Sequence, residues 1–184
     1  MQFTVYDKAT GKILRSGFSV TPDIQAGNDS EGVVIGVSEP FGYVQNGEVI
    51  KIVAPSEFHQ FDYVTKTWVL NLSEAKAQAK DRITKSRNAE EANGFTAYGN
   101  VFDSDTTAVQ RISVAVQAAN AVGETFTVVW TCKDNTTITL DYAQTLALPA
   151  FMADVANTLH IKARKLKDQI DSASSLEEIN LIVW

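Results

Sequence analysis

Residues 125–140 read TFTVVWTCKDNTTITL and predict a β-hairpin with a tight turn at Asp134 and Asn135. Both halves of this stretch are rich in threonine, valine and other strand-favouring residues. Aspartate and asparagine suit the turn because their short side chains bond the local backbone and tolerate the left-handed conformation. A long helical pattern follows directly, and Asp141 and Gln144 have the spacing of a capping box at its start.

The same order of elements, hairpin then helix, comes just before this stretch. Short strand patterns flank the turn residues 98–100, and the acidic run 103–105 offers an N-cap for a helix that ends at Gly123. Apolar residues recur along both long helices at three- and four-residue spacing. They are Val109, Ile112, Val116 and Ala119 on the first helix, and Leu148, Met152, Val155, Leu159, Leu166 and Ile170 on the second. Pro149 implies either a kink in the second helix or a helix that begins there.

A last short helix is expected after Ser175, which forms a second capping-box pattern with Glu178.

Residues 1–70 have the pattern of a β-rich domain. Asn46 and Gly47 stand between two short apolar segments, and this pair is the strongest hairpin signal because a type I′ turn needs a positive φ at both positions. Other strand patterns flank two further turns, and one short apolar strand follows an exposed loop. These segments are the turns 7–11 and 64–66, the strand 33–37 and the loop 22–32. The hairpins predict a small antiparallel sheet or an open barrel, with strand edges that so small a sheet cannot all cover.

A helix is expected over residues 72–93, with Ser73 at its N-cap and Gly94 as its C-terminal cap. Its apolar stripe is thin. It consists of Ala75, Ala79 and Ile83. Such a stripe suits a solvated connector or a helix that packs against another chain. The sequence therefore predicts an α+β protein in three parts: a β-rich docking domain in 1–70, a connecting helix in 71–93, and a domain of two β-hairpins and long helices in 94–184.

Composition narrows the classes of partner. The 184 residues carry a formal charge of −6, which argues against nucleic acid or an anionic membrane as the main partner. Cys132 is the single cysteine, so no internal disulfide can form, and its place in a strand pattern predicts a buried, inert thiol. No signal-peptide pattern or transmembrane stretch is present, and we expect the protein to stay in a cytoplasm or to leave it inside an assembly.

Few residues could support chemistry. His59 and His160 lie in no catalytic motif, and no glycine-rich phosphate loop is present. The acidic run 103–105 suggests a calcium loop, but Ala108 and Val114 stand where that loop needs glycine and glutamate. We therefore expect no catalytic residue, no cofactor or cofactor-binding residue, no metal ligand and no enzymatic activity.

Several short pieces of residues 94–184 stand in a distinctive order and spacing. They are Gly94 and Phe95; residues 102–105 (FDSD); Gln110, Arg111 and Ile112; Trp130; Asp134, Asn135 and Thr136; Leu140; residues 163–167 (ARKLK); Ile170; Glu177, Glu178 and Ile179; and Trp184. Together they resemble a C-terminal domain of unknown function, with an Asp-Asn-Thr motif, that tail-module proteins of tailed phages and prophages carry. Residues 61–69 are similar to the region that precedes this domain in such proteins.

The resemblance implies a non-enzymatic structural protein of a bacteriophage tail, which attaches to baseplate or tail-fibre proteins. It implies protein–protein interaction with other virion components, in a homo-oligomer or a symmetric multi-copy assembly, with neither nucleic acid nor membrane as partner. The expected location is the virion tail, after assembly in the cytoplasm of the bacterial host.

Two alternatives remain open. One is a tail fibre assembly chaperone that is absent from the mature particle. The other is a glycan-acting enzyme on the tail, which would need two carboxylates that converge in a pocket roughly 5–10 Å apart.

Overall fold

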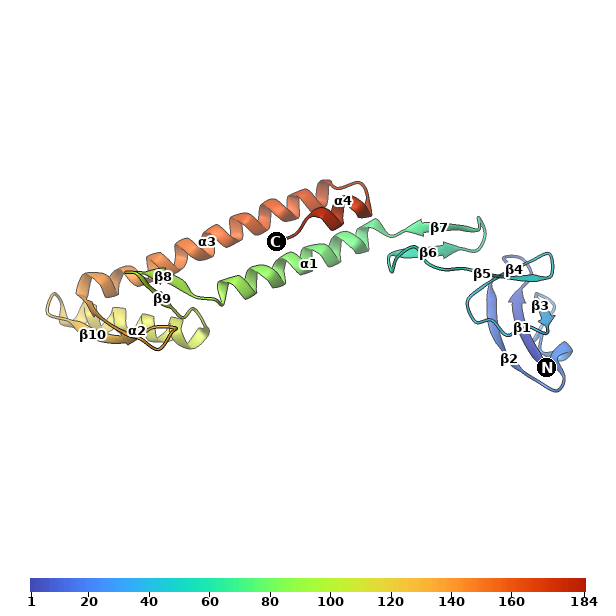
Figure 1. Ribbon diagram of the computed structural model, residues 1–184, viewed down its shortest axis with the longest axis horizontal. Coiled ribbons are helices and arrows are strands. Elements are labelled where there is room, and N and C mark those ends of the chain that lie inside the picture. The colour runs from blue at the N-terminus through green and yellow to red at the C-terminus, as the bar shows by residue number, and fades with distance from the viewer. The chain divides into compact units, whose positions relative to one another are not determined.

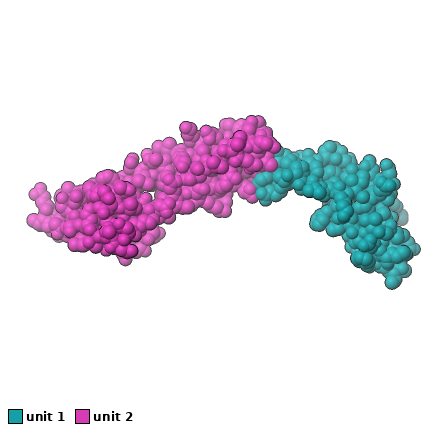
Figure 2. All heavy atoms as spheres, viewed as in Figure 1, with its two compact units in different colours: residues 1–71 teal, residues 72–184 magenta.

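The computed structural model describes residues 1–184, which form two compact units, Met1–Asn71 and Leu72–Trp184 (Figure 2). The fold is α+β, as predicted, with antiparallel strands in unit 1 and with helices and further hairpins in unit 2. Unit 1 contains β1 (Gln2–Asp7), β2 (Ile13–Phe18), the 3-10 helix η1 (Pro22–Ile24), β3 (Glu31–Ile35), β4 (Gly42–Gln45), β5 (Glu48–Lys51), β6 (His59–Asp62) and β7 (Thr67–Leu70). Unit 2 contains α1 (Leu72–Glu91), β8 (Phe95–Ala97), β9 (Asn100–Phe102), α2 (Thr106–Val122), β10 (Thr127–Thr131), β11 (Thr137–Asp141), α3 (Tyr142–Ser172) and α4 (Leu176–Leu181).

Unit 1 is built on a three-stranded antiparallel sheet in the order β2-β1-β3. Phe3 and Val5 of the central strand are buried on one face. Thr4 is buried on the other face, where its hydroxyl donates to the carbonyl of Val37 at 2.9 Å. The pairs β4-β5 and β6-β7 form separate two-stranded hairpins. Of the two architectures that the sequence left open, an antiparallel sheet and an open barrel, unit 1 therefore has the small antiparallel sheet.

The predicted turns of unit 1 are confirmed. Asn46 and Gly47 have φ values of 53° and 80°, as a type I′ turn requires. Lys66 also has a positive φ, of 60°, in the turn between β6 and β7. In the turn after β1, the Asp7 carboxylate accepts from both the backbone N–H and the hydroxyl of Thr10, at 2.7 Å each.

Aromatic contacts join the two hairpins of unit 1. The ring of Phe61 stacks on Tyr43 with a centroid distance of 5.4 Å, and it meets the rings of Tyr63 and Trp68 edge-on at 5.1 Å each. The Lys66 ammonium lies 4.5 Å from the centroid of the Tyr43 ring. Ring packing and a cation–π contact therefore hold β4-β5 and β6-β7 together, in place of backbone pairing between them.

In unit 2, α1 and α3 lie side by side and run in opposite directions (Figure 1). The buried residues of α1 are Ala75, Ala79 and Ile83, which is the predicted stripe. Alanine lets two helices approach closely, and Ala163 is buried on α3. The segment 71–93, which the sequence analysis treats as a separate connector, thus contributes a helix that packs within unit 2.

Polar contacts tie α1 to the C-terminal part of unit 2. Lys76 donates to the backbone carbonyl of Asp171 at 2.8 Å, and Lys80 forms an ion pair with the Asp171 carboxylate. Arg82 donates to the carbonyl of Ile182 at 3.0 Å, just after α4. These contacts fix the level at which α1 meets α3 and α4.

The main core of unit 2 lies where the two hairpins meet α2 and the first turns of α3. Phe95 and Phe102 stack with a centroid distance of 5.3 Å. The buried core residues are Phe95, Ala97, Phe102, Ile112, Leu140 and Leu148. Half-buried Val128 and Trp130 of β10 pack against this core from the hairpin. The hairpin predicted over residues 125–140 is confirmed, with Thr127 opposite Asp141 and Thr131 opposite Thr137.

Most predicted helix boundaries are confirmed. Asp105 caps α2 by accepting from the N–H of Ala108 at 2.8 Å. Asp141 and Gln144 form the predicted capping box at the start of α3. The helix therefore begins before Pro149, which lies inside it, and a start at Pro149 is wrong.

Three details of the helices differ from the prediction. Ser73 is not the N-cap of α1, because the helix already begins at Leu72. Val109 is exposed, whereas Ile112 and Ala119 are buried as predicted and Val116 is half-buried against the core. The other buried residues of α2 are Ala108 and Ala115. At α4, Ser175 accepts from the N–H of Glu178 as predicted, but the Glu178 carboxylate accepts from the N–H of Ser174.

The α1–α3 contact yields a first prediction. Ile83 is fully buried, so Ile83→Ala should lower the free energy of unfolding by about 2–5 kcal/mol. Gln78→Ala, at an exposed position of the same helix, should change it by less than about 0.5 kcal/mol. Urea unfolding followed by far-ultraviolet circular dichroism measures both. Equal stability of the two variants would show that α1 does not depend on this contact.

A second prediction concerns two glycines of positive φ. A Cβ added at Gly94 (φ 96°) would lie 2.1 Å from the carbonyl oxygen of Phe102, whereas one at Gly123 (φ 82°) would meet no atom within 4 Å. Both alanine variants carry the backbone penalty of about 1–2 kcal/mol. Gly94→Ala should be clearly the less stable in thermal unfolding, because β9 must also move. A smaller loss at Gly94 than at Gly123 would contradict this.

The third prediction is a dependence of unit 1 on pH. A hydrogen bond from Arg15 lowers the pKa of Glu31, and one from Lys51 lowers the pKa of Glu39. Because the folded pKa values lie below the ordinary value of 4.5, these groups stabilise unit 1 above that pH, and the contribution is lost as the pH falls below it. Urea unfolding at a series of pH values, followed by the amide NMR signals of β1–β3, measures this. Replacing Glu31 and Glu39 together by glutamine should flatten the dependence, and stability that rises on acidification would contradict it.

Candidate protein-binding site

The first histidine lies in a loop of unit 1 and contacts a serine. The Ser56 hydroxyl and His59 Nδ1 are 2.8 Å apart, and the same hydroxyl accepts from the N–H of Phe58 at 3.2 Å. No carboxylate lies within 4 Å of His59 to orient the ring. Ser56 therefore organises the start of β6, and its hydroxyl is shared between two local partners.

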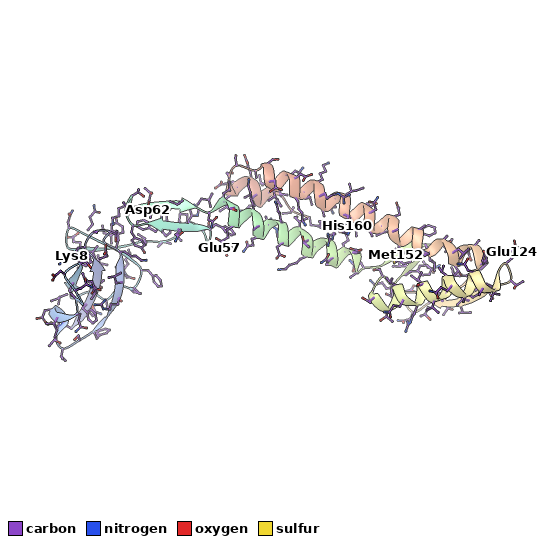
Figure 3. The ribbon with its side chains drawn as sticks, turned by 180° about the vertical axis from the view of Figure 1, so that it is seen from behind. Lys8, Glu57, Asp62, Glu124, Met152 and His160 are labelled. Atoms are coloured by element: carbon purple, nitrogen blue, oxygen red, sulfur yellow. The ribbon has the colours of Figure 1, made fainter.

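The second histidine lies on α3 and faces α1 (Figure 3). His160 Nε2 is 3.9 Å from the Glu91 carboxylate, and Nδ1 is 3.5 Å from an Arg87 nitrogen. Near the same level, the Lys162 ammonium lies 4.1 Å from the centroid of the Trp184 ring. These side chains join the two helices and the C-terminal residues at a partly exposed surface.

Cys132 and the motif residues after it serve the hairpin. Cys132 is buried, and its N–H donates to the Thr136 carbonyl at 2.8 Å. The Asp134 carboxylate accepts from the Thr136 hydroxyl at 2.6 Å and from its N–H at 2.9 Å. These bonds, chiefly that from the hydroxyl, lower the pKa of Asp134. Asn135 has a φ of 66°. The Asp-Asn-Thr motif is thus a turn that fixes the hairpin.

No group of three histidine, cysteine, aspartate or glutamate side chains is placed to hold a metal ion. Asp105, from the acidic run considered as a calcium loop, caps α2. None of the helices is both long and apolar enough to cross a membrane.

Unit 2 contains an apolar groove of about 750 Å³ between α2 and β10. It is lined by Asp103, Thr107, Ala108, Gln110, Arg111, Val114, Ala115, Ala118, Phe126, Val128, Val129, Trp130 and Thr131. The groove contains exposed apolar side chains from both walls, because Val114 of α2 is 64% exposed and Val129 of β10 is 68% exposed. Contiguous exposed apolar surface of this kind is typical of a protein-binding site.

Backbone groups along the same groove have no partner within the chain. In the hairpin, β11 is the one strand that pairs with β10. The N–H of Cys132 donates a hydrogen bond to the carbonyl of Thr136, so the backbone groups of Cys132 face the β11 side of the hairpin. Along an antiparallel ladder every second residue faces the partner strand in this way. The N–H and carbonyl groups of Thr127, Val129 and Thr131 therefore point away from β11.

Exposed apolar side chains also lie around one end of the unit 1 sheet. We call them the sheet-end patch, which consists of Phe18, Val20, Ile35 and Val37. Phe18 pairs with Gln2 and Ile35 pairs with Phe3, so β2 ends and β3 ends beside the start of β1, with the Phe18 and Ile35 side chains on opposite faces of the sheet. Phe18 is 76% exposed and Val20 is 95% exposed. Both β2 and β3 are edge strands.

Sequence reasoning did not find either surface. The hairpin was recognised, but the α2–β10 groove depends on residues of two elements that become neighbours only in the fold. One signal was available. Val128 and Val129 are consecutive in a strand, so one of the two valines must lie on the solvent face.

The family described as a domain of unknown function (DUF4376) matches residues 74–183. No curated protein and no solved structure matches the chain significantly. The matched region covers nearly all of unit 2, including both of its hairpins and the groove. It amounts to more than half of the 184 residues. The chain is therefore a member of the DUF4376 family, a domain family of unknown function.

Proposed function

We propose that this protein is a non-enzymatic structural component of a bacteriophage tail, which binds other virion proteins at the baseplate or the tail fibre. The geometry that supports it best is the sheet-end patch of unit 1, where large apolar side chains are exposed at the ends of two edge strands. A surface of this type suits the binding of a partner protein. The phage context comes from the resemblance of residues 94–184 to tail-module proteins.

In this proposal unit 1 binds a tail, baseplate or fibre protein, and unit 2 holds the assembled copies together. The serine, histidine and aspartate side chains described above form contacts within turns, helix caps and helix–helix packing, which supports a structural role. Ser56, Asp134 and Asp105 each accept a hydrogen bond from a nearby backbone N–H, and these bonds order a loop, a turn and the start of a helix, respectively. Such contacts use polar groups to stabilise a fixed shape.

The test is mass spectrometry of purified phage particles from a host that encodes the chain, together with deletion of its gene. The chain should be present in mature particles in a constant ratio to the tail proteins, and particles without it should lack a baseplate or fibre component. A chain that is needed for fibre assembly but absent from mature particles would identify the alternative, a tail fibre assembly chaperone. Normal, infective particles after deletion would contradict both.

A matched pair of variants tests the sheet-end patch itself. Val20→Asp should lower the number of copies per particle by at least about tenfold, because a charge opposes burial of this patch against a partner. Val53→Asp, at a similarly exposed valine of unit 1 outside the patch, should leave the copy number unchanged. Equal incorporation of the two variants would show that the patch does not bind the tail.

A further inference from the structure

We propose that β10 pairs with β10 of a second copy of the chain, antiparallel and across a two-fold axis at Val129. This pairing would turn two separate hairpins into one four-stranded sheet in the order β11-β10-β10-β11. It depends only on unit 2 and holds whether or not the protein belongs to a phage tail.

The backbone of β10 offers a free edge of five residues. The outward N–H and carbonyl groups of Thr127, Val129 and Thr131 form no hydrogen bond within the chain. The next outward group, the N–H of Lys133, donates to the carbonyl of Val101 at 2.9 Å and so ends the free edge. A free edge of this length is a template for another strand.

The exposed side chains of β10 can pair with the same side chains of a second copy of the chain. Thr127, Val129 and Thr131 point to the exposed face of the strand, and their order, Thr-Val-Thr, is the same in both directions. A two-fold axis at Val129 places this valine opposite its counterpart and each threonine opposite the other threonine. Cross-strand pairs of this kind stabilise a sheet. None of the three carries a charge, so a like pairing brings no repulsion.

The groove gives a second strand room beside β10. It runs between the free edge and α2, has a volume of about 750 Å³, and leaves Val114 on its far wall exposed. A strand placed there would cover Val114 and Val129 together. A two-stranded sheet is narrow for the helix that lies beside it, and a second copy would extend the sheet over that helix.

Charge around the groove is compatible with a second copy. Arg111 lines the groove, and it forms no ion pair in its own chain. With the axis at Val129, Glu124 of the second copy comes opposite Asp134 and next to Lys133, and Glu124 also lacks a partner in its own chain. Asp103 also lines the groove, and the carboxylates of Asp103 and Asp134 oppose any attraction of Glu124 to Arg111 or Lys133. The pairing therefore depends mainly on the strand edge.

The two-fold axis gives an experiment that other partners would not satisfy. Val129→Lys places two ammonium groups opposite each other, and Val129→Glu places two carboxylates opposite each other. Each variant alone should dimerise at least about tenfold more weakly than the unmodified chain in sedimentation-velocity ultracentrifugation. An equimolar mixture of the two should recover the dimer, because each lysine then faces a glutamate.

Thr139→Lys is the matched control. Thr139 is the neighbour of Val129 on β11 and is also exposed, but it is not on the free edge of β10. This variant should remain dimeric. Far-ultraviolet circular dichroism confirms that each variant is folded, and a variant that unfolds is replaced by Val129→Arg or Val129→Asp. A monomer at all concentrations, a dimer unaffected by charge at residue 129, or variants that the mixture does not rescue would each overturn the proposal.

Discussion

Packing against α3 is the interaction on which unit 2 depends. This helix contacts α1, α2, β8 and β11, so elements from both ends of the unit meet on it. Leu148 contributes to the main core, whereas Ala163 and Ile170 are buried further along the helix. Because most helix stability in a folded protein comes from packing of the apolar face, the three buried residues of α1 make its stability depend on α3 beside it.

Unit 1 is stabilised in a different way. Its sheet has three strands, and its two hairpins lie outside that sheet. Aromatic stacking, cation–π contacts and hydrogen-bonded carboxylates supply much of what a larger core would supply elsewhere. Isolated two-stranded hairpins are marginally stable in water, and the stacking of Phe61 on Tyr43 joins two of them. The same small size leaves edge strands and apolar side chains exposed, and these are the features that the proposed function uses.

The two proposals assign different surfaces to different tasks. The sheet-end patch of unit 1 is proposed to bind a foreign protein, whereas the free edge of β10 is proposed to bind the same strand of a second copy. A multi-copy assembly needs both kinds of contact. The first depends on exposed apolar area, and the second depends on backbone groups and a self-matching row of side chains, so each can fail without the other.

Local sequence determined the turns, the caps and the type of each element. Asn46 and Gly47 determine a hairpin because few other residues tolerate a positive φ, and Asp105 and Asp141 determine helix starts because their carboxylates accept from free N–H groups. These effects act over a few residues, so a sequence displays them directly. On α2 the predicted Ile112 and Ala119 are buried, but Val109 is exposed and Ala108 is buried instead, since alanines and valines on neighbouring faces give similar patterns.

Only the tertiary structure decided which surfaces remain open. The partner of α1, the separation of unit 1 into a sheet and two hairpins, and the groove beside β10 all depend on contacts between residues far apart in the chain. The sequence shows that Val128 and Val129 point to opposite faces of the strand, but only the fold shows that the face with Val129 is the exposed one. Whether a side chain is buried depends on which other elements pack against it, and the sequence of a single helix or strand does not specify those elements.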